Sequence, residues 1–355
     1  MKKSILFALT SLLIICSCKD NVTPFKPVAT GAPYEVLVLC NDELWEAPAG
    51  RALFRVLDTD VPGLPQPERS FRISQISEAA FSTIFRPMRN IIEVKIDPAQ
   101  YTQTKYKFTR DKYATSQMIL TIQSPNAEAF REYVSQNGQT IINFFTSAEM
   151  NRELKELEKE HNTAFNDSVR KKFNCELLIP AGLTGIKSGK DFLWASDIAT
   201  NKRSIQNIVM YSYPYTDESN FSLENYLNKR DSIMKINIPG GREGQYMTTE
   251  HMYTDIKNTE FRERFMQIAR GLWSMENDMM GGPYVSHGMV DEINNRVIVV
   301  EAFVYAPEEK KRNHIRKLEA ALYTLRLPAD KEVRNSIHIP EIVVENNDSI
   351  QTVQQ

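Results

Sequence analysis

The sequence predicts an α+β protein in which antiparallel sheets pack against helices. Strand-like runs followed by a helical stretch occur twice along the chain, which favours this class over repeated β-α-β winding. A long amphipathic helical segment separates the two sets, and a last helix follows a strongly apolar strand. The hydrophobic content of 42% and aromatic content of 10% suit a packed interior.

The first 17 residues have the pattern of an export signal. A basic start at Met1–Lys3 precedes the apolar run Ile5–Ile15, which is about 11 residues long against the roughly 20 needed to span a bilayer as a helix. The run ends in Ile15-Cys16-Ser17-Cys18, which resembles the bacterial lipobox. The resemblance implies cleavage before Cys18 and acylation of its sulfur, which would hold the protein at a lipid bilayer. The alternative is an ordinary secretory signal with a chance cysteine.

Residues 18–33 follow as a tether. This segment contains three prolines and little apolar content, so we expect it to be extended. Lys19 and Asp20 resemble the surface-export signal of Bacteroidetes lipoproteins, which Asn21 interrupts here. We therefore expect an exported lipoprotein of the outer membrane and leave open whether it faces the periplasm or the cell surface.

An N-terminal α/β region is predicted at 34–125. The apolar run Tyr34–Cys40 indicates a buried strand, and Pro48–Asp58 has helical spacing. The proline-rich stretch Thr59–Arg69 must be a loop. Further strands are predicted at 71–76, 91–96, 106–108 and 117–123.

Residues 126–174 are predicted as one long helical segment, with a break near Gly138. Its second part carries an apolar stripe at spacings of four and three residues, formed by Met150, Leu154, Leu157, His161 and Ala164. The stripe covers barely two heptads, which favours packing on the protein's own core over a coiled-coil partner face.

A C-terminal α+β domain is predicted at 175–328. Pro307, followed by two glutamates, is expected to open a helix that lies on the second sheet and stops at Pro328. Residues 329–355 form a polar tail that we expect to be disordered. Strands are predicted at 175–180, 192–197, 205–213, 246–255 and 295–305, a helix at 223–236, and either state at 261–273.

Four short motifs in this domain resemble those of a known family. They are Tyr226–Asp231 (YLNKRD), Gly271–Trp273 (GLW), Asp278–Val285 (DMMGGPYV), and Phe303–Pro307 (FVYAP) followed by Lys311-Arg312. Together they resemble an uncharacterised lipoprotein family of Bacteroidetes, domain of unknown function 4837. The resemblance implies a match over nearly the whole mature chain and an envelope location. It implies no activity and no catalytic residues.

Cys40 and Cys175 remain in the mature chain beside Cys18. In an oxidising compartment they could form a disulfide, or each could stay a buried thiol beside its strand. Two cysteines without a C-x-x-C pair cannot build a zinc ribbon, and the five histidines are scattered. We predict no metal site and no cofactor.

The candidate binding residues centre on a glycine pair. Gly281, Gly282, Pro283 and Tyr284 could form a loop that, with Trp273, stacks on a sugar or peptide ring, and Arg242 lies in another turn-rich loop. The competing interpretation, which we favour, is a structural turn between a helix and a strand.

Common catalytic motifs are incomplete. Gly185–Asp191 (GIKSGKD) departs from a phosphate-binding loop at both ends, and Ser232 with Lys235 forms an S-x-x-K pair without its partner motifs. The net charge of −2 offers no basis for binding nucleic acid.

We therefore predict a membrane-anchored, non-enzymatic envelope lipoprotein that binds or scaffolds an envelope protein or a glycan through its C-terminal domain. The alternative is an envelope hydrolase with its site near Arg242, Glu243, Asp278 and the Gly-Gly-Pro segment.

Overall fold

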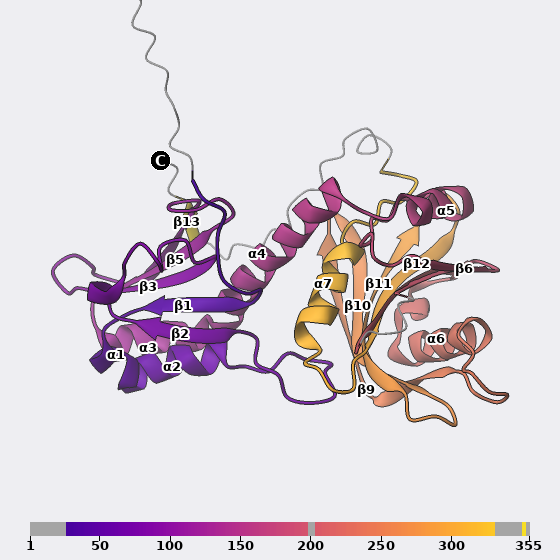
Figure 1. Cartoon of the computed structure of the whole chain (residues 1–355), viewed down its shortest axis with the longest axis horizontal. Coiled ribbons are helices and arrows are strands. Elements are labelled where there is room, and N and C mark those ends of the chain that lie inside the picture. The colour runs from indigo at the N-terminus through magenta and orange to yellow at the C-terminus, as the bar shows by residue number, and fades with distance from the viewer. Residues whose placement is uncertain (1–25, 198–202, 331–349, 353–355) are drawn as a thin grey trace, which may run out of the picture.

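The structure, a computed structural model, describes residues 26–197, 203–330 and, for the backbone, 350–352. The predicted signal, Cys18 and most of the predicted tail lie outside these residues. Two sheets lie side by side, with the long helix α4 running from one to the other (Figure 1). Among the described residues, no helix is long and apolar enough to cross a membrane.

The first sheet is mixed. Its order is β4-β5-β3-β1-β2, with the short β13 (Ile350–Thr352) beside β4. Only the β4–β5 pair is antiparallel; β1 runs parallel to β2 and β3, and β3 runs parallel to β5. The five main strands are β1 (Glu35–Leu39), β2 (Arg72–Ile76), β3 (Asn90–Ile96), β4 (Lys105–Arg110) and β5 (Met118–Ser124).

The α+β class is confirmed, but the expected antiparallel pairing fails for this first sheet. A parallel neighbour needs a long crossover, and the helices α1 (Asp42–Glu46) and α2 (Pro48–Leu57) supply it between β1 and β2. The continuous apolar run of β1 already carried this signal, because parallel strands are buried on both faces. Val36 and Val38 point to the helical side, whereas Leu37 and Leu39 enter a smaller cluster on the other face.

The central helical segment consists of three helices. They are α3 (Ala127–Gln136), α4 (Gly138–Lys159) and α5 (Thr163–Phe173). The first break falls at Asn137, beside the predicted Gly138, and Asn162 caps α5 through its side-chain oxygen. Met150, Leu154 and Leu157 of the predicted stripe are buried, as expected for a helix on its own core. The other two predicted members do not continue the stripe, because α4 ends at Lys159, before His161, and Ala164 is exposed on α5.

The second sheet is antiparallel throughout, in the order β6-β7-β8-β12-β11-β10-β9. One face is covered by α5 and by α7 (Arg312–Leu322), and the other by α6 (Leu223–Asn237) and the 3₁₀ turn η2 (Glu218–Phe221). The undecided stretch 261–273 is mostly strand. The strand predicted at 175–180 is absent, since Glu176 forms only an isolated bridge to Arg326. The seven strands are β6 (Gly185–Gly189), β7 (Phe192–Ser196), β8 (Ile205–Pro214), β9 (Met247–Phe261), β10 (Arg264–Met275), β11 (Gly281–Asp291) and β12 (Arg296–Tyr305).

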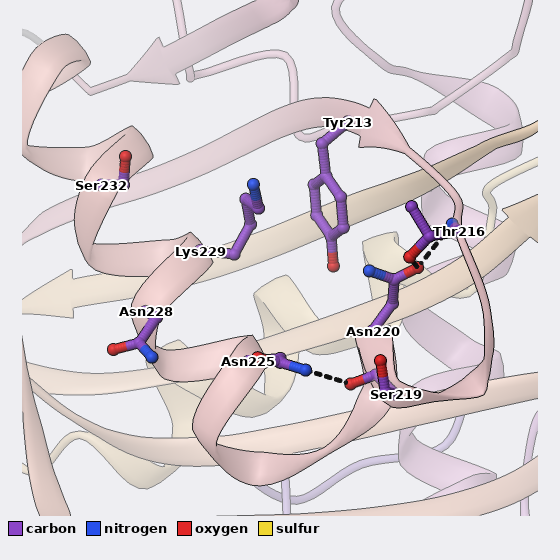
Figure 2. Close-up of a pocket in the computed structure, with 8 residues that line it drawn as sticks. All are labelled: Tyr213, Thr216, Ser219, Asn220, Asn225, Asn228, Lys229 and Ser232. Atoms are coloured by element: carbon purple, nitrogen blue, oxygen red, sulfur yellow. Dashed lines mark hydrogen bonds between the residues drawn. The ribbon is translucent and has the colours of Figure 1, made fainter.

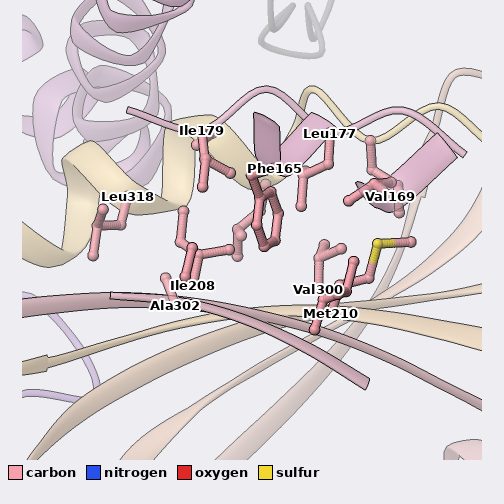
Figure 3. Close-up of a cluster of buried hydrophobic side chains, with 14 of the residues drawn as sticks. Phe165, Val169, Leu177, Ile179, Ile208, Met210, Val300, Ala302 and Leu318 are labelled. Atoms are coloured by element: carbon pink, nitrogen blue, oxygen red, sulfur yellow. The ribbon is translucent and has the colours of Figure 1, made fainter. Parts of the chain in front are cut away.

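The larger core lies between this sheet and α5 and α7. Phe165 of α5 and Leu318 of α7 lie in the same buried cluster as Val300 and Ala302 of β12 (Figure 3). Each large apolar side chain buried there contributes roughly 1.5–3 kcal/mol. This cluster confirms that the C-terminal helix packs on the second sheet.

The last helix begins later than predicted, at Arg312 rather than Pro307, and ends at Leu322. The reason lies in the other half of the chain. Glu68, from the predicted proline-rich loop, accepts hydrogen bonds from the backbone N–H groups of Lys311 (2.7 Å) and Arg312 (3.1 Å). A carboxylate from a distant loop thus takes the role of the N-cap.

Candidate functional site

The residues predicted to form a stacking loop lie in two paired strands. Trp273 of β10 stands opposite Gly282 of β11, and Leu272 stands opposite Pro283. Trp273 and Tyr284 are 3% and 1% exposed, and a Cβ at Gly282 would collide with the carbonyl oxygen of Val304. Close strand packing therefore explains the glycine, and the structure contains neither the predicted binding loop nor the competing turn at this position.

Arg242 lies in an exposed turn that is tied to a second turn. Its backbone N–H donates to Gln245 Oε1 at 3.0 Å, and Gln245 Nε2 donates to Asp278 Oδ2 at 2.9 Å. Gln245 is buried, whereas Glu243 is exposed. The side-chain amide of Gln245 thus links the turn that contains Arg242 and Glu243 to the turn that contains Asp278, residues proposed for the alternative hydrolase site.

A buried ion pair lies beneath α6. Arg230 and Glu301 are both fully buried, and the guanidinium contacts both carboxylate oxygens at 2.7–3.2 Å. The guanidinium carbon also lies 4.0 Å from the centre of the Tyr284 ring. Burial alone would lower the pKa of Arg230, but the Glu301 carboxylate reverses this and raises it, so the arginine stays charged.

This pair continues outward to the surface. Thr249 accepts a hydrogen bond from Arg230 Nη1 at 2.6 Å and donates to Asp231, whose second oxygen lies 2.7 Å from His251 Nε2. Sequence reasoning missed this network. The available signal was Glu301, a single charge inside the apolar strand β12.

A polar pocket of about 440 Å³ opens on the outer side of the same helix (Figure 2). This volume falls within the range of small-molecule sites. It is lined by the residues Tyr213, Thr216, Ser219, Asn220, Asn225, Asn228, Lys229 and Ser232.

Helical spacing explains half of this lining. Asn225, Asn228, Lys229 and Ser232 recur at intervals of three, one and three residues, which places them on one face of α6. The opposite face, which includes Arg230, is buried against the sheet. From the sequence, Ser232 stood out only as part of an incomplete S-x-x-K pair; the polar stripe along α6 was the signal that could have marked the pocket.

Hydrogen bonds fix how two amides are turned. Asn220 Oδ1 accepts from the backbone N–H groups of Thr216 (2.8 Å) and Asp217 (3.3 Å), so its NH₂ group faces the pocket. Asn225 Nδ2 donates to the carbonyl oxygen of Ser219 at 2.8 Å. The Tyr213 hydroxyl points between Asn220 and Lys229, and burial raises its pKa to about 12.

The lining offers binding groups rather than acid–base groups. None of its eight residues is a carboxylate or a histidine, and all carry a hydrogen-bonding side chain. Such a surface can satisfy the hydroxyl groups of a polar ligand, and it provides no general base that titrates near neutral pH.

Comparison with known families finds one match in each half of the chain. Residues 162–324 match DUF4837, a domain of unknown function. This matched segment contains the pocket, the buried ion pair and all four short motifs. Residues 29–158 match another domain of unknown function, DUF8532. The two matches divide the chain at the end of α4, so the DUF4837 match is shorter than the resemblance implied.

Other comparisons add little. The Ran-binding protein Mog1p of Saccharomyces cerevisiae is similar at 8% identity over 45% of this chain and 92% of its own, with a TM-score of 0.29. A point mutant of protein Mog1 is similar at 9% identity over 43% of this chain and 90% of its own, with a TM-score of 0.28. These scores are too low to support an argument about function. No curated protein matches the chain.

The two cysteines do not form the disulfide that we left open. Both are free and buried, Cys175 in the core of the DUF4837 domain and Cys40 in that of the DUF8532 domain. Burial, and then the nearby Asp42 carboxylate, raises the pKa of Cys40 to about 11. Within the described parts of both domains, no three His, Cys, Asp or Glu side chains gather as metal ligands would.

Proposed function

We propose that this protein is an envelope lipoprotein, anchored by an acylated Cys18 in the outer membrane, whose DUF4837 domain binds a glycan in the polar pocket. The function is retention of a ligand and involves no chemical step. The residues that would bind are Tyr213, Asn220, Asn228, Lys229 and Ser232.

The anchor is supported by the sequence before the described residues. A basic start, a short apolar run and Cys18 stand in the order that lipid attachment requires. The tether of about 15 residues could hold the folded part at most on the order of 50 Å from the lipid surface. This reach would let the pocket meet glycans near the membrane.

The single observation that carries the binding function is the composition of the pocket. Hydroxyl and amide groups from η2, α6 and the end of β8 converge there, and an aromatic ring lies among them. Amides and hydroxyls both donate and accept, as do the hydroxyls of a sugar. A glycan therefore fits the lining better than an apolar segment of a partner protein.

Calorimetric titration of the purified mature protein with defined envelope oligosaccharides tests this proposal. The double variant Asn228→Ala, Ser232→Ala should weaken binding about tenfold, because two hydrogen-bonding groups are lost. Asn143→Ala removes an exposed helix amide far from the pocket and should leave affinity unchanged. Equal weakening by both changes, or no binding by the unaltered protein, would refute the site. Cleavage of the oligosaccharide would favour the hydrolase alternative.

Radiolabelled palmitate tests the anchor separately. The unaltered chain should incorporate label and sediment with membranes, and Cys18→Ala should do neither. Label that persists in the variant would show that the sulfur of Cys18 is not the attachment point.

A further inference from the structure

We infer that the ligand of the polar pocket carries a carboxylate or phosphate group, which the ammonium group of Lys229 binds. The inference rests on the proposed glycan-binding function and names the ligand class for that same site.

The charge of the lining is one-sided. Lys229 is the only charged residue among the eight, and it has no carboxylate within ion-pair distance in the described part of the chain. Its ammonium nitrogen lies 5.2 Å from the centre of the Tyr213 ring. The ring holds the ammonium group beside the pocket. The N–H hydrogens of Lys229 stay available to a ligand, because a π-face accepts no strong hydrogen bond.

The uncharged side chains of the pocket also favour a ligand that accepts hydrogen bonds. Asn220 Oδ1 is occupied by three donors from Thr216 and Asp217, which leaves the NH₂ group of that amide for the pocket. Lys229 contributes only donors. Figure 2 shows these two groups on either side of the Tyr213 hydroxyl, so a ligand there meets a donor from each side. A carboxylate or phosphate oxygen satisfies such donors, and charge-assisted hydrogen bonds are the stronger kind.

Nearby acidic residues limit the range of this attraction. Asp217, which caps η2, Glu218 of η2 and Glu224 of α6 are exposed and do not line the pocket. Asp217 accepts the backbone N–H of Ser219 at 2.8 Å, and hydrogen bonds from Ser219 lower the pKa of its carboxyl group. These negative charges oppose long-range steering, so recognition of the anion occurs at contact with Lys229.

Two sources of the anion share this chemistry, namely a uronic acid and a sugar phosphate. The test compares three oligosaccharides of equal length: one neutral, one with a uronate and one with a phosphate. Calorimetric titration of the mature protein should show one or both acidic ligands binding about tenfold more tightly than the neutral one, an advantage that falls as salt increases. The stronger of the two acidic arms identifies the source.

Variants of two lysines on α6 complete the test. Lys229→Gln should bring the acidic ligand down to the affinity of the neutral one, and Lys229→Arg should keep most of the difference. Lys235 is the matched control, because it also lies over a tyrosine, 4.3 Å from the centre of the Tyr246 ring, but outside the pocket. Lys235→Gln should change neither affinity.

The outcomes separate this inference from the proposed function. Equal affinity for the neutral and acidic ligands would refute the inference that the ligand is anionic and would leave the proposal of glycan binding standing. No binding of any of the three would refute the pocket as a glycan site. An acidic preference that survives Lys229→Gln would remove Lys229 from the recognition.

Discussion

At the scale of single residues, the interior between the second sheet and its helices contains several ionisable groups where apolar ones would pack more easily. Arg230 and Glu301 are paired, whereas His287 of β11 is 1% exposed and neither of its ring nitrogens has a hydrogen-bond partner. The ring lies 4.5 Å from that of Tyr323, centre to centre. Each of these groups depends on its surroundings for its ionisation state, so each can be tested by substitution.

Removing one partner of the buried ion pair should destabilise the protein strongly, whereas replacing both partners by apolar residues should destabilise it little. Arg230→Met leaves the Glu301 carboxylate buried without its counter-ion, and we expect the free energy of unfolding to fall by about 3–5 kcal/mol in urea denaturation. The double variant Arg230→Met, Glu301→Leu should recover most of this loss. Lys229→Gln, at the exposed neighbouring position, serves as the control. A single variant as stable as the unaltered protein would show that the pair is not buried.

His287 should make stability depend on pH. Burial lowers the pKa of His287 from 6.5 to about 4, with Glu319 opposing the shift and Arg270 adding to it. Between these two values the unfolded chain binds a proton that the folded chain does not, so the free energy of unfolding falls as pH falls, by up to roughly 3 kcal/mol. Above pH 6.5 this contribution disappears, because both states are neutral.

The variant His287→Leu should lose this part of the pH dependence. Urea denaturation at pH 7 and pH 4.5 should show a smaller decrease for the variant than for the unaltered protein. Identical decreases would mean that the histidine is not buried in its neutral form.

At the scale of elements, the beginning of α7 shows how one half of the chain shapes the other. Pro307 and the two glutamates after it are residues that favour the start of a helix, yet α7 begins only at Arg312, beside the Glu68 carboxylate. Arg316, one turn on, donates to the carbonyl oxygen of Ser70 at 3.0 Å. Sequence rules for helix ends are local, so they could not anticipate a cap from 243 residues away.

Removing this cap should destabilise the protein. Glu68→Ala leaves two backbone N–H groups without their acceptor, and we expect a loss of about 1–2 kcal/mol in the free energy of unfolding. Glu78→Ala, which removes an exposed carboxylate paired with Lys95, should cost less than about 0.5 kcal/mol. Thermal denaturation of both variants provides the comparison, and an equal effect would show that Glu68 is not a cap.

At the scale of the whole molecule, two cores are joined through α4 and the contacts around α7. Each core contains one cysteine, Cys40 in the first and Cys175 in the second. The separation of the two cores explains why an oxidising compartment does not suffice for a disulfide, because the thiols must also meet.

The free thiols can be counted directly. A thiol-reactive dye is added without reductant to the mature protein, in which the proposed acyl group blocks the Cys18 sulfur. It should label almost nothing in the native state and two cysteines after denaturation, since burial shields the sulfur atoms of Cys40 and Cys175. The variant Cys175→Ser should reduce the count to one. Failure to label the denatured protein would indicate a disulfide between the two residues.

Sequence reasoning located most elements because their signals are local. The apolar run of β1, the break predicted near Gly138 and the amphipathic pattern of α4 each arise from residues that are close together in the chain. The candidate binding residues failed for the opposite reason. Gly281–Tyr284 has the composition of a loop, and its burial depends on β10 and β12, which lie on either side of it in the sheet.

By itself, the sequence determined the α+β class, the two strand-rich halves and a final helix on the second sheet. It also contains the whole basis for predicting an acylated Cys18. Only the tertiary structure decided that the first sheet is largely parallel, that Glu68 caps α7 and that a polar pocket opens between β8, η2 and α6. The physical reason is that helix and strand formation follows from the spacing of neighbouring side chains, whereas strand pairing and pockets depend on segments that meet only when the chain folds.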